Sequence, residues 1–177
     1  NVISGTGHKT IDQSLALHRD YHLFSDAKDA WTFGDENYEN EYCTVFRWRE
    51  AFQNDFAARM DWCVTPYAEA NHHPVAVVNG DPSRCPIEMT ASAGDKVTLD
   101  ASGSTDPDGD RLAFKWFVYH EVGTYKSPIE IANAKSFLAT IHVPHDAASK
   151  NLHIILMLSD DGDPSLVSYR RVIAAVK

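Results

Sequence analysis

The stretch from Val97 to Trp116 constrains the fold more than any other part of this chain. It reads VTLDASGSTDPDGDRLAFKW and places an acidic, glycine-bearing turn between two strand patterns. Residues 98–101 favour a strand, and alternate residues from Leu112 to Val118 are apolar, which puts them on one face of a second strand. The segment 106–110 cannot continue a strand, because Pro and Gly break the ladder and short acids favour turns. The sequence therefore predicts two β-strands around an acidic corner.

The rest of the C-terminal part continues this pattern of short strands and turns. Turn-forming residues near 81–83, 93–95, 144–146 and 160–164 separate short apolar runs. We expect strands over residues 74–79, 96–101, 112–121, 136–143, 152–159 and 167–176. Strands of this number and length over about 100 residues are typical of an immunoglobulin-like sandwich.

The N-terminal part has a different, helical pattern. Residues 44–63 predict one helix, because apolar residues recur there at steps of three or four and Thr44 can cap the start. A weaker helix is expected over 11–24, with an irregular, acidic segment over 25–42. Proline and polar residues from Pro66 to Pro74 mark a boundary. The predicted fold is α+β overall, with a helical and irregular segment over 1–73 and an all-β sandwich over 74–177.

Composition limits the partners and the compartment. The formal net charge of −9 argues against nucleic acid, which requires concentrated Lys and Arg, and we interpret Arg170 and Arg171 as solvated strand residues. No apolar run approaches the roughly 20 residues needed to span a bilayer, so no membrane partner is expected. The chain opens on Asn1 with no signal peptide, as expected of a mature product or a fragment. Cys43, Cys63 and Cys85 lack metal-ligand spacing, which leaves open either one disulfide, with Cys63–Cys85 the first pair to test, or three reduced thiols.

One face of the predicted sandwich is apolar where a polar face would be normal. If Trp116 points inward, then the opposite side carries Phe117, Tyr119 and Met157 together with the isoleucines at 155 and 173. Such a surface is rarely left in water. Either another module covers it, such as the helix that carries Trp48, Phe52 and Phe56, or it is an aromatic platform on which sugar rings stack.

Two resemblances follow from these motifs. The Gly-Ser-rich strand end, the DPDGD turn and the strand with Trp116 resemble the polycystic-kidney-disease (PKD) type of immunoglobulin-like domain. A more specific pattern is TVFRWREAFQNDFAARMDW over 44–62, ANHHPVA over 70–76, HEVGTY over 120–125 and SYRRV over 168–172. It resembles the C-terminal part of a family of secreted proteins described as cellulose-binding, with a nucleoside-hydrolase-like N-terminal domain.

The second resemblance implies a function and a location. It implies that residues 1–73 end a nucleoside-hydrolase-like domain that lies mostly upstream. It also implies that the sandwich is a non-catalytic, secreted, extracellular module of a carbohydrate-active protein, which either binds a polysaccharide such as cellulose or is structural and stabilises its N-terminal neighbour. The ligand-binding candidates are Phe117, Tyr119, Tyr125 and Met157. The alternative is a fragment of a nucleoside-hydrolase-like glycosidase with its catalytic domain upstream. In that case the candidates for completing a pocket are Arg47, Arg49, Asn54 and Asp55.

The acidic turn is a candidate metal site. Asp106, Asp108 and Asp110, with Asp100 close by in the sequence, supply the hard oxygen ligands that calcium prefers. Some PKD-like domains bind calcium near a similar turn, so the resemblance implies calcium as a possible cofactor. The alternative is a plain acidic turn. The chain holds no complete catalytic site: it lacks the N-terminal aspartate cluster with which nucleoside hydrolases hold calcium.

Overall fold

The structure, a computed structural model, describes residues 29–177. The chain divides into two compact units between Glu50 and Ala51, and each is described by itself. The helix expected over 11–24 lies outside the described residues. The domain boundary that the sequence predicts between residues 73 and 74 stays a prediction.

The described part of the first unit is a β-hairpin followed by a short helix. β1 (Asp29–Phe33) pairs antiparallel with β2 (Glu36–Asn40) around Gly34, whose φ is 59°. Asn40 Oδ1 accepts hydrogen bonds from the backbone N–H groups of Tyr42 and Cys43, at 2.9 and 3.1 Å, where α2 (Cys43–Phe46) begins. Two expectations are corrected here. The segment from Asp29 to Asn40 is a hairpin, and the helix begins after Tyr42 rather than at Thr44, with Asn40 accepting the two backbone N–H bonds at its start.

The single helix predicted over 44–63 is two helices. The N–H of Trp48 bonds to the carbonyl of Val45 at 3.0 Å, a tight three-residue turn after which α3 (Arg49–Asp61) begins. Within α3 the buried residue is Ala58, whereas Phe52, Phe56 and Met60 are 48%, 63% and 50% exposed. The predicted apolar stripe is therefore not the packed face of the helix, and Phe52 and Phe56 are not buried over the sheet.

After α3 the chain runs through a linker that contains the short 3-10 helix η2 (Tyr67–Glu69). The indole Nε1 of Trp62 donates to the carbonyl of Asn71 at 2.8 Å and fixes the path of this linker. The strand predicted over 74–79 is absent. Only isolated bridges occur there, between Val75 and Thr105 and between Val78 and Asp81, because Pro74 has no N–H and the chain turns back with positive φ at Asn79 and Gly80.

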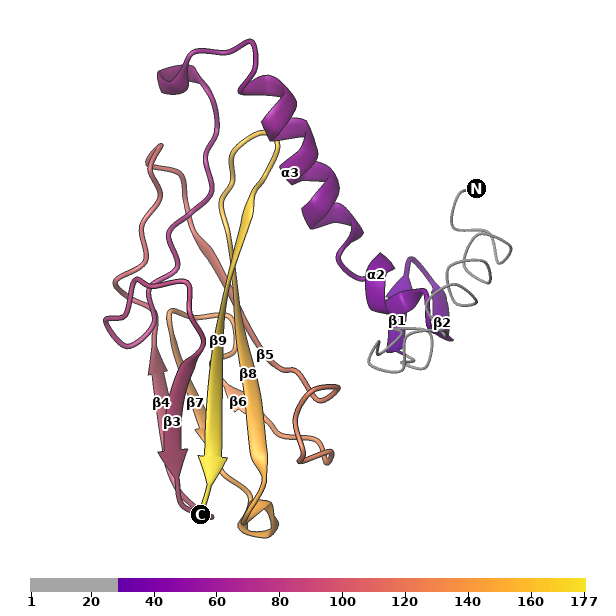
Figure 1. The fold of residues 1–177 in the computed structure, drawn as a ribbon, viewed down its shortest axis with the longest axis vertical. Helices are drawn as coiled ribbons and strands as arrows, with labels where there is room; N and C mark the ends of the chain where they lie inside the picture. The colour runs from indigo at the N-terminus through magenta and orange to yellow at the C-terminus, as the bar shows by residue number, and fades with distance from the viewer. Residues whose placement is uncertain (1–28) are drawn as a thin grey trace, which may run out of the picture. The chain divides into compact units, whose positions relative to one another are not determined.

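Most of the second unit is a sandwich of two β-sheets (Figure 1). The order in the larger sheet is β3-β9-β8-β5 and in the smaller one β4-β7-β6, with only β3 and β9 parallel among the neighbouring strands of these sheets. The larger sheet contains β3 (Ile87–Ala91), β5 (Ala113–Val118), β8 (Asn151–Ser159) and β9 (Val167–Val176). The smaller sheet contains β4 (Lys96–Asp100), β6 (Ile131–Ala132) and β7 (Leu138–His142), and the 3-10 helix η3 (His145–Ala147) follows it.

The core lies between the two sheets and follows the predicted alternation. Trp116 is 3% exposed, and its Nε1 donates to the carbonyl of Ser136 at 2.9 Å. The predicted inward residues of β8 and β9 are buried against it: Ile154, Leu156, Leu158, Val172, Ala174 and Val176. Each large aliphatic side chain buried this way contributes about 1.5–3 kcal/mol. The all-β sandwich predicted for the C-terminal part is confirmed.

Cysteines and hydropathy add two findings about residues 29–177. Cys43 is buried, Cys63 and Cys85 are exposed, and all three are free thiols, so the Cys63–Cys85 disulfide considered from the sequence is not formed. No helix among the described residues has both the length and the apolar character needed to cross a membrane.

Candidate functional site

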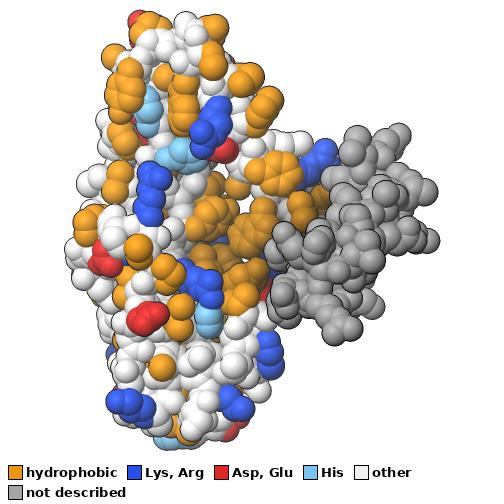
Figure 2. Space-filling view, viewed as in Figure 1, with side chains coloured by type: hydrophobic (Ala, Val, Ile, Leu, Met, Phe, Trp, Pro, Cys, Tyr) orange, Lys and Arg blue, Asp and Glu red, His pale blue; other side chains and the backbone are white. Residues whose placement is uncertain are grey.

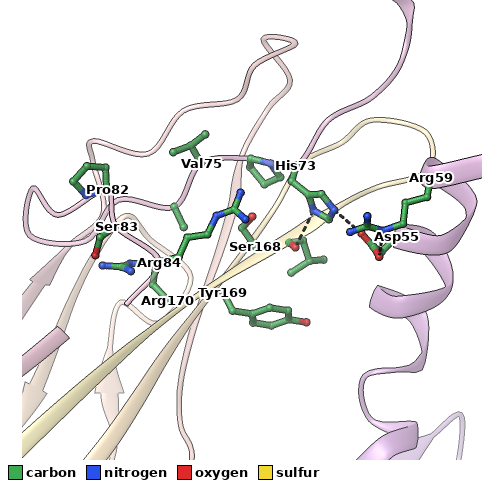
Figure 3. Close-up of a pocket in the computed structure, with 13 residues that line it drawn as sticks. Asp55, Arg59, His73, Val75, Pro82, Ser83, Arg84, Ser168, Tyr169 and Arg170 are labelled. Atoms are coloured by element: carbon green, nitrogen blue, oxygen red, sulfur yellow. Dashed lines mark hydrogen bonds and ion pairs between the residues drawn. The ribbon is translucent and has the colours of Figure 1, made fainter. Parts of the chain in front are cut away.

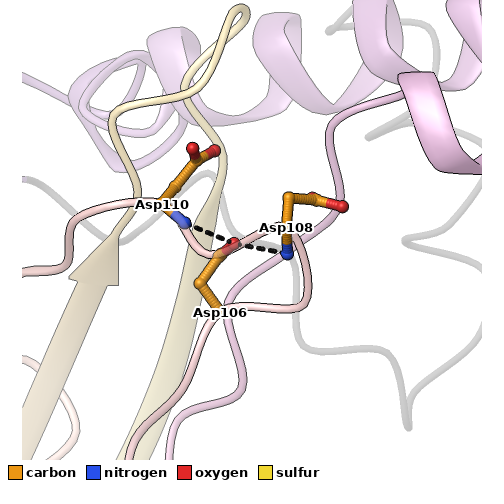
Figure 4. A group of neighbouring side chains, drawn as sticks. All are labelled: Asp106, Asp108 and Asp110. Atoms are coloured by element: carbon orange, nitrogen blue, oxygen red, sulfur yellow. Dashed lines mark hydrogen bonds between the residues drawn. The ribbon is translucent and has the colours of Figure 1, made fainter.

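The acidic corner begins as a self-supporting turn just before β5. Asp106 Oδ1 accepts hydrogen bonds from the N–H groups of Asp108 and Asp110, at 2.8 and 3.2 Å (Figure 4). This Asx-type arrangement is the reason that aspartate suits the first position of the turn. It brings ligand atoms of all three carboxylates within 4.8 Å of one another.

Segments far apart in the sequence meet the acidic corner. The backbone N–H of His72 donates to Asp108 Oδ2 at 2.6 Å, and its ring Nδ1 lies 2.9 Å from Asp108 Oδ1. The N–H of Arg111 donates to Asp161 Oδ1 at 2.7 Å, which joins the two acidic turns. Asn71 donates from Nδ2 to the carbonyl of Pro164 at 2.8 Å. The linker and the β8–β9 loop therefore both border the corner.

The corner has more negative charge than its protein partners neutralise. Burial raises the pKa of Asp110, and the neighbouring carboxylates raise it further, in the order Asp106, Asp161, Asp160 and Asp108. Asp106 Oδ2 and Asn71 Oδ1 are buried and have no hydrogen-bond partner among the described residues. Buried oxygens without donors are an arrangement that a calcium ion would satisfy.

Asp100, which the sequence grouped with these acids, is engaged elsewhere. Its carboxylate accepts from the N–H of Ser102 at 2.8 Å, and this hydrogen bond lowers its pKa. The group of carboxylates within reach of one ion contains Asp106, Asp108 and Asp110 but not Asp100.

The outer face of the larger sheet carries three of the four predicted ligand-binding residues. Phe117, Tyr119 and Met157 are half-buried, with Phe117 at the end of β5 paired with Ile155 of β8. Met157 pairs with Tyr169 of β9, which is 40% exposed and was not among the candidates. Tyr125 is different: it is 8% exposed, and its hydroxyl donates to Asp146 Oδ1 at 2.8 Å. Its ring belongs to the core and is not part of the outer surface of the sheet, so the ligand-binding role predicted for it is not supported.

The residues predicted to complete a hydrolase pocket lie in two places. Arg47 and Arg49 belong to the first unit, where the Arg47 guanidinium lies 4.8 Å from the Trp48 ring centroid. In the second unit, Asn54 Nδ2 donates to the carbonyl of Ser165 at 2.9 Å, which ties α3 to the β8–β9 loop. Asp55 is held by Arg59 Nε and His73 Nε2, each at 2.8 Å, and the hydrogen bond from Arg59 is the main reason that its pKa is lowered.

A groove of about 420 Å³ lies beside Asp55 and was not predicted. Its walls come from α3, from the 73–76 segment, from the 82–84 loop and from the start of β9. Figure 3 shows Asp55, Arg59 and His73 on the helix side and Pro82, Ser83 and Arg84 on the loop side. Figure 2 shows histidine, basic and hydrophobic side chains close together in this part of the molecular surface. No single sequence motif marks the groove, because its residues come from four segments.

The comparisons with known proteins connect this chain to one family. Residues 96–176 match the family described as "Cellulose-binding protein Sde0182, C-terminal domain". A solved structure from Saccharophagus degradans, described as a nucleoside hydrolase-related hypothetical protein associated with carbohydrate metabolism, is 41% identical, with a TM-score of 0.75. The match covers 85% of this chain and 40% of that one, so the chain spans less than half the length of this relative. The resemblance to this family is confirmed.

Other matches are weaker. The PKD domain of the KIAA 1837 protein is 24% identical over 54% of this chain and 83% of its own, with a TM-score of 0.39. The human CDH23 segment EC21-23 is 10% identical over 59% of this chain and 33% of its own, with a TM-score of 0.42. At these scores the likeness carries no argument. No curated protein matches the chain.

Proposed function

We propose that this chain is a non-catalytic, polysaccharide-binding part of a larger secreted protein with a nucleoside-hydrolase-like domain upstream. The observation that carries the proposal is the match of residues 96–176 to a family described as cellulose-binding. The relative from Saccharophagus degradans supports it, because that protein is associated with carbohydrate metabolism and only 40% of its length is covered by this chain.

The surface we assign to the polysaccharide is the outer face of the larger sheet. Phe117, Tyr119 and Met157 form it, and Tyr169 extends it across the β8–β9 pair. Aromatic rings offer a large, rigid apolar area at low entropic cost, which suits the flat C–H faces of sugar rings. Its side chains lie on three neighbouring strands or directly after one of them, so an extended chain ligand could cross all of them.

The test is retention of the protein on microcrystalline cellulose, compared with soluble glucans. We expect binding by the wild type and at least a several-fold loss in Tyr119→Ala, with thermal unfolding measured to confirm the native fold. Tyr67→Ala is the matched control, because Tyr67 is 73% exposed on η2, away from the sheet. Failure of the wild type to bind any polysaccharide would reject the function. A loss in Tyr67→Ala alone would reject the assigned surface.

A second candidate function follows from the description of the relative as nucleoside hydrolase-related. In that case the chain is the C-terminal end of a glycosidase, and Arg47, Arg49, Asn54 and Asp55 complete the pocket of an upstream catalytic domain. Nucleoside hydrolysis by the longest native form of the protein, compared in wild type and Arg49→Ala, tests this. Equal rates in the two proteins would contradict a role for Arg49.

We also propose calcium at the acidic corner, held by Asp106, Asp108 and Asp110. Support comes from the buried, unpartnered Asp106 Oδ2 and from the raised pKa of Asp110, which burial and then the neighbouring carboxylates cause. Bound calcium would join the 71–72 linker to the sandwich through Asp108, which already contacts His72.

Calorimetric titration and thermal unfolding test the metal site. Calcium at about 100 times its dissociation constant should stabilise the protein by about 2.7 kcal/mol. Magnesium should act less, since it demands a tighter octahedron. Asp106→Asn should abolish the effect, whereas Asp100→Asn should retain it, because the Asp100 carboxylate is bound to Ser102 instead. Equal loss in both variants would show that calcium acts through general charge.

A further inference from the structure

The groove beside Asp55 carries a local excess of positive charge in an acidic protein. Its lining includes Arg59, Arg84 and Arg170 but only one carboxylate, Asp55. The whole chain has a net charge of −9, whereas the lining of this groove, with three arginines and one carboxylate, is positively charged. Clefts lined by one sign of charge raise the local concentration of ligands of the opposite sign.

Arg170 is the unusual residue of the groove. It is 2% exposed, contrary to its interpretation as a solvated strand residue. Its Nη1 donates to the carbonyl of Cys85 at 2.7 Å, and its Nη2 lies 3.2 Å from Asp81 Oδ2. Its Nε is buried and has no partner among the described residues. A buried donor left unpaired costs free energy, which a hydrogen bond to a water molecule or another acceptor would offset.

Arg84 supplies a cation that the protein does not neutralise. It is exposed on the loop opposite α3, and within residues 29–177 its side chain makes no hydrogen bond or ion pair. Arg59, in contrast, is neutralised by Asp55, because its Nε lies 2.8 Å from Asp55 Oδ2 in an ion pair. The side of the groove made by the 82–84 loop and β9 is therefore its more electropositive side.

We propose that this groove binds a sugar acid, that is, a monosaccharide unit bearing a carboxylate. The fork of an arginine matches a carboxylate and holds it through parallel N–H···O bonds, which assigns the carboxylate to the exposed Arg84. Both Nη atoms of Arg170 are already bound to protein oxygens, so Arg170 contributes its charge to the wall of the groove. Ser83 and Ser168 supply groups for the sugar hydroxyls, and Val75 and Pro82 supply an apolar wall. The volume of about 420 Å³ lies within the usual range for small-molecule sites.

This site goes beyond the proposed polysaccharide binding and does not depend on it. Cellulose carries no charge, and of the side chains assigned to its surface only Tyr169 also lines the groove. A sugar acid could be a free monosaccharide or a unit of an acidic polysaccharide, and both present the same carboxylate.

The first experiment titrates the full chain with glucuronate, glucose and inorganic phosphate by calorimetry. Glucuronate and glucose differ only at the carboxylate, so we expect glucuronate to bind at least about ten-fold more tightly, as one charged hydrogen-bonded contact implies. The binding should weaken with added salt. Equal affinity for glucose would overturn the proposal, and so would phosphate binding as tight as glucuronate, which would show a general anion site. Comparison of glucuronate with a polyuronate then distinguishes the free sugar from the polymer.

The second experiment uses two matched variants. Arg84→Gln removes a cation of the groove, and Arg111→Gln removes an exposed arginine that does not line it. Both side chains are exposed, so both variants should keep the unfolding temperature of the wild type. We expect about a ten-fold loss of glucuronate affinity in Arg84→Gln and less than a two-fold change in Arg111→Gln. Equal losses, or no loss in Arg84→Gln, would overturn the assignment. Unchanged cellulose retention in Arg84→Gln would show that the two sites are separate.

Discussion

At the scale of single residues, the pKa of Asp110 depends on its surroundings in the acidic corner. Its pKa is raised by burial and by the carboxylates around it. Since the folded-state pKa lies above the ordinary value, the folded protein binds the proton more tightly than the unfolded chain does. The stability that this proton contributes is fully present below the ordinary pKa and is lost as pH rises through the raised one.

The substitution Asp110→Asn should therefore act in opposite directions with and without calcium. In the metal-free protein at neutral pH it removes a repelled charge, so the unfolding temperature should rise above that of the wild type. With calcium present it removes a ligand, so the stabilisation by the metal should shrink or vanish. Thermal unfolding in chelator and in millimolar calcium measures both. A lower unfolding temperature in chelator would contradict the repulsion.

A second residue-scale prediction concerns the buried charge of Arg170. Arg170→Met keeps much of the side-chain volume but leaves the carbonyl of Cys85 without its donor. We expect a loss of about 1–3 kcal/mol of unfolding free energy, measured with urea. Asp81→Asn should cost less than about 1 kcal/mol, because the Asp81 side chain is 43% exposed and its ion pair is screened by water. A larger loss in the Asp81 variant would show that the ion pair, not the carbonyl contact, stabilises this region.

Single residues also show the limit of sequence reasoning. Asp106, Asp108 and Asp110 could be grouped from the sequence because they belong to one turn, and the structure brings their carboxylates together. Asn71 and Asp161 join them through pairings of segments distant in the chain, which no local pattern encodes. Arg170 alternates with apolar inward residues on β9, so its burial was visible in the period-two pattern. Because arginine is charged, we interpreted Arg170 from the sequence as a solvated residue, whereas the structure buries it.

At the scale of elements, α3 shows why an apolar stripe does not always mark the packed face. Phe52, Phe56 and Met60 stay about half exposed, whereas Ala58 is 1% exposed and lines a small cavity with Trp62, Ala70 and Pro164. A small residue lets the helix approach the linker and the β8–β9 loop closely. Polar contacts from Asn54 and Asp55 then fix its position.

The matched pair Ala58→Leu and Ala57→Leu tests this account. Leucine and alanine are both good helix formers, so neither change disturbs the helix itself. Ala58→Leu overfills the contact and should cost about 1–3 kcal/mol of unfolding free energy. Ala57 is exposed, so its variant should change stability by less than about 0.5 kcal/mol. Urea unfolding measures both, and equal effects would place the packed face elsewhere.

Some strands of the sandwich have a sequence pattern that predicts them, and others do not. β9 was predicted from its sequence with the observed bounds, and β4, β5, β7 and β8 nearly so, because each alternates between two turns. β3 and the two-residue β6 were missed. β3 follows Pro86 in an exposed loop and is a strand because it pairs in parallel with β9, which lies about 80 residues further along the chain.

At the scale of the whole molecule, the hydrophobic core of the second unit is built from residues of that unit. The core lies between residues 76 and 176, and α3 is anchored to the same unit through Asn54, Asp55 and Ala58. A chain of this length can bury a sufficient core without help. We therefore expect residues 49–177, expressed alone and beginning with α3, to fold and to unfold in one cooperative transition.

That shortened chain should keep the two binding properties assigned to the second unit. Its unfolding temperature should rise with calcium, and it should bind glucuronate with the affinity of the full chain, because every residue assigned to these sites lies after Glu50. Calorimetric scanning with and without calcium, together with the glucuronate titration, measures this. A broad, non-cooperative transition would show that the sandwich requires the first 48 residues. A cooperative transition with both ligand responses lost would instead contradict the placement of the two sites.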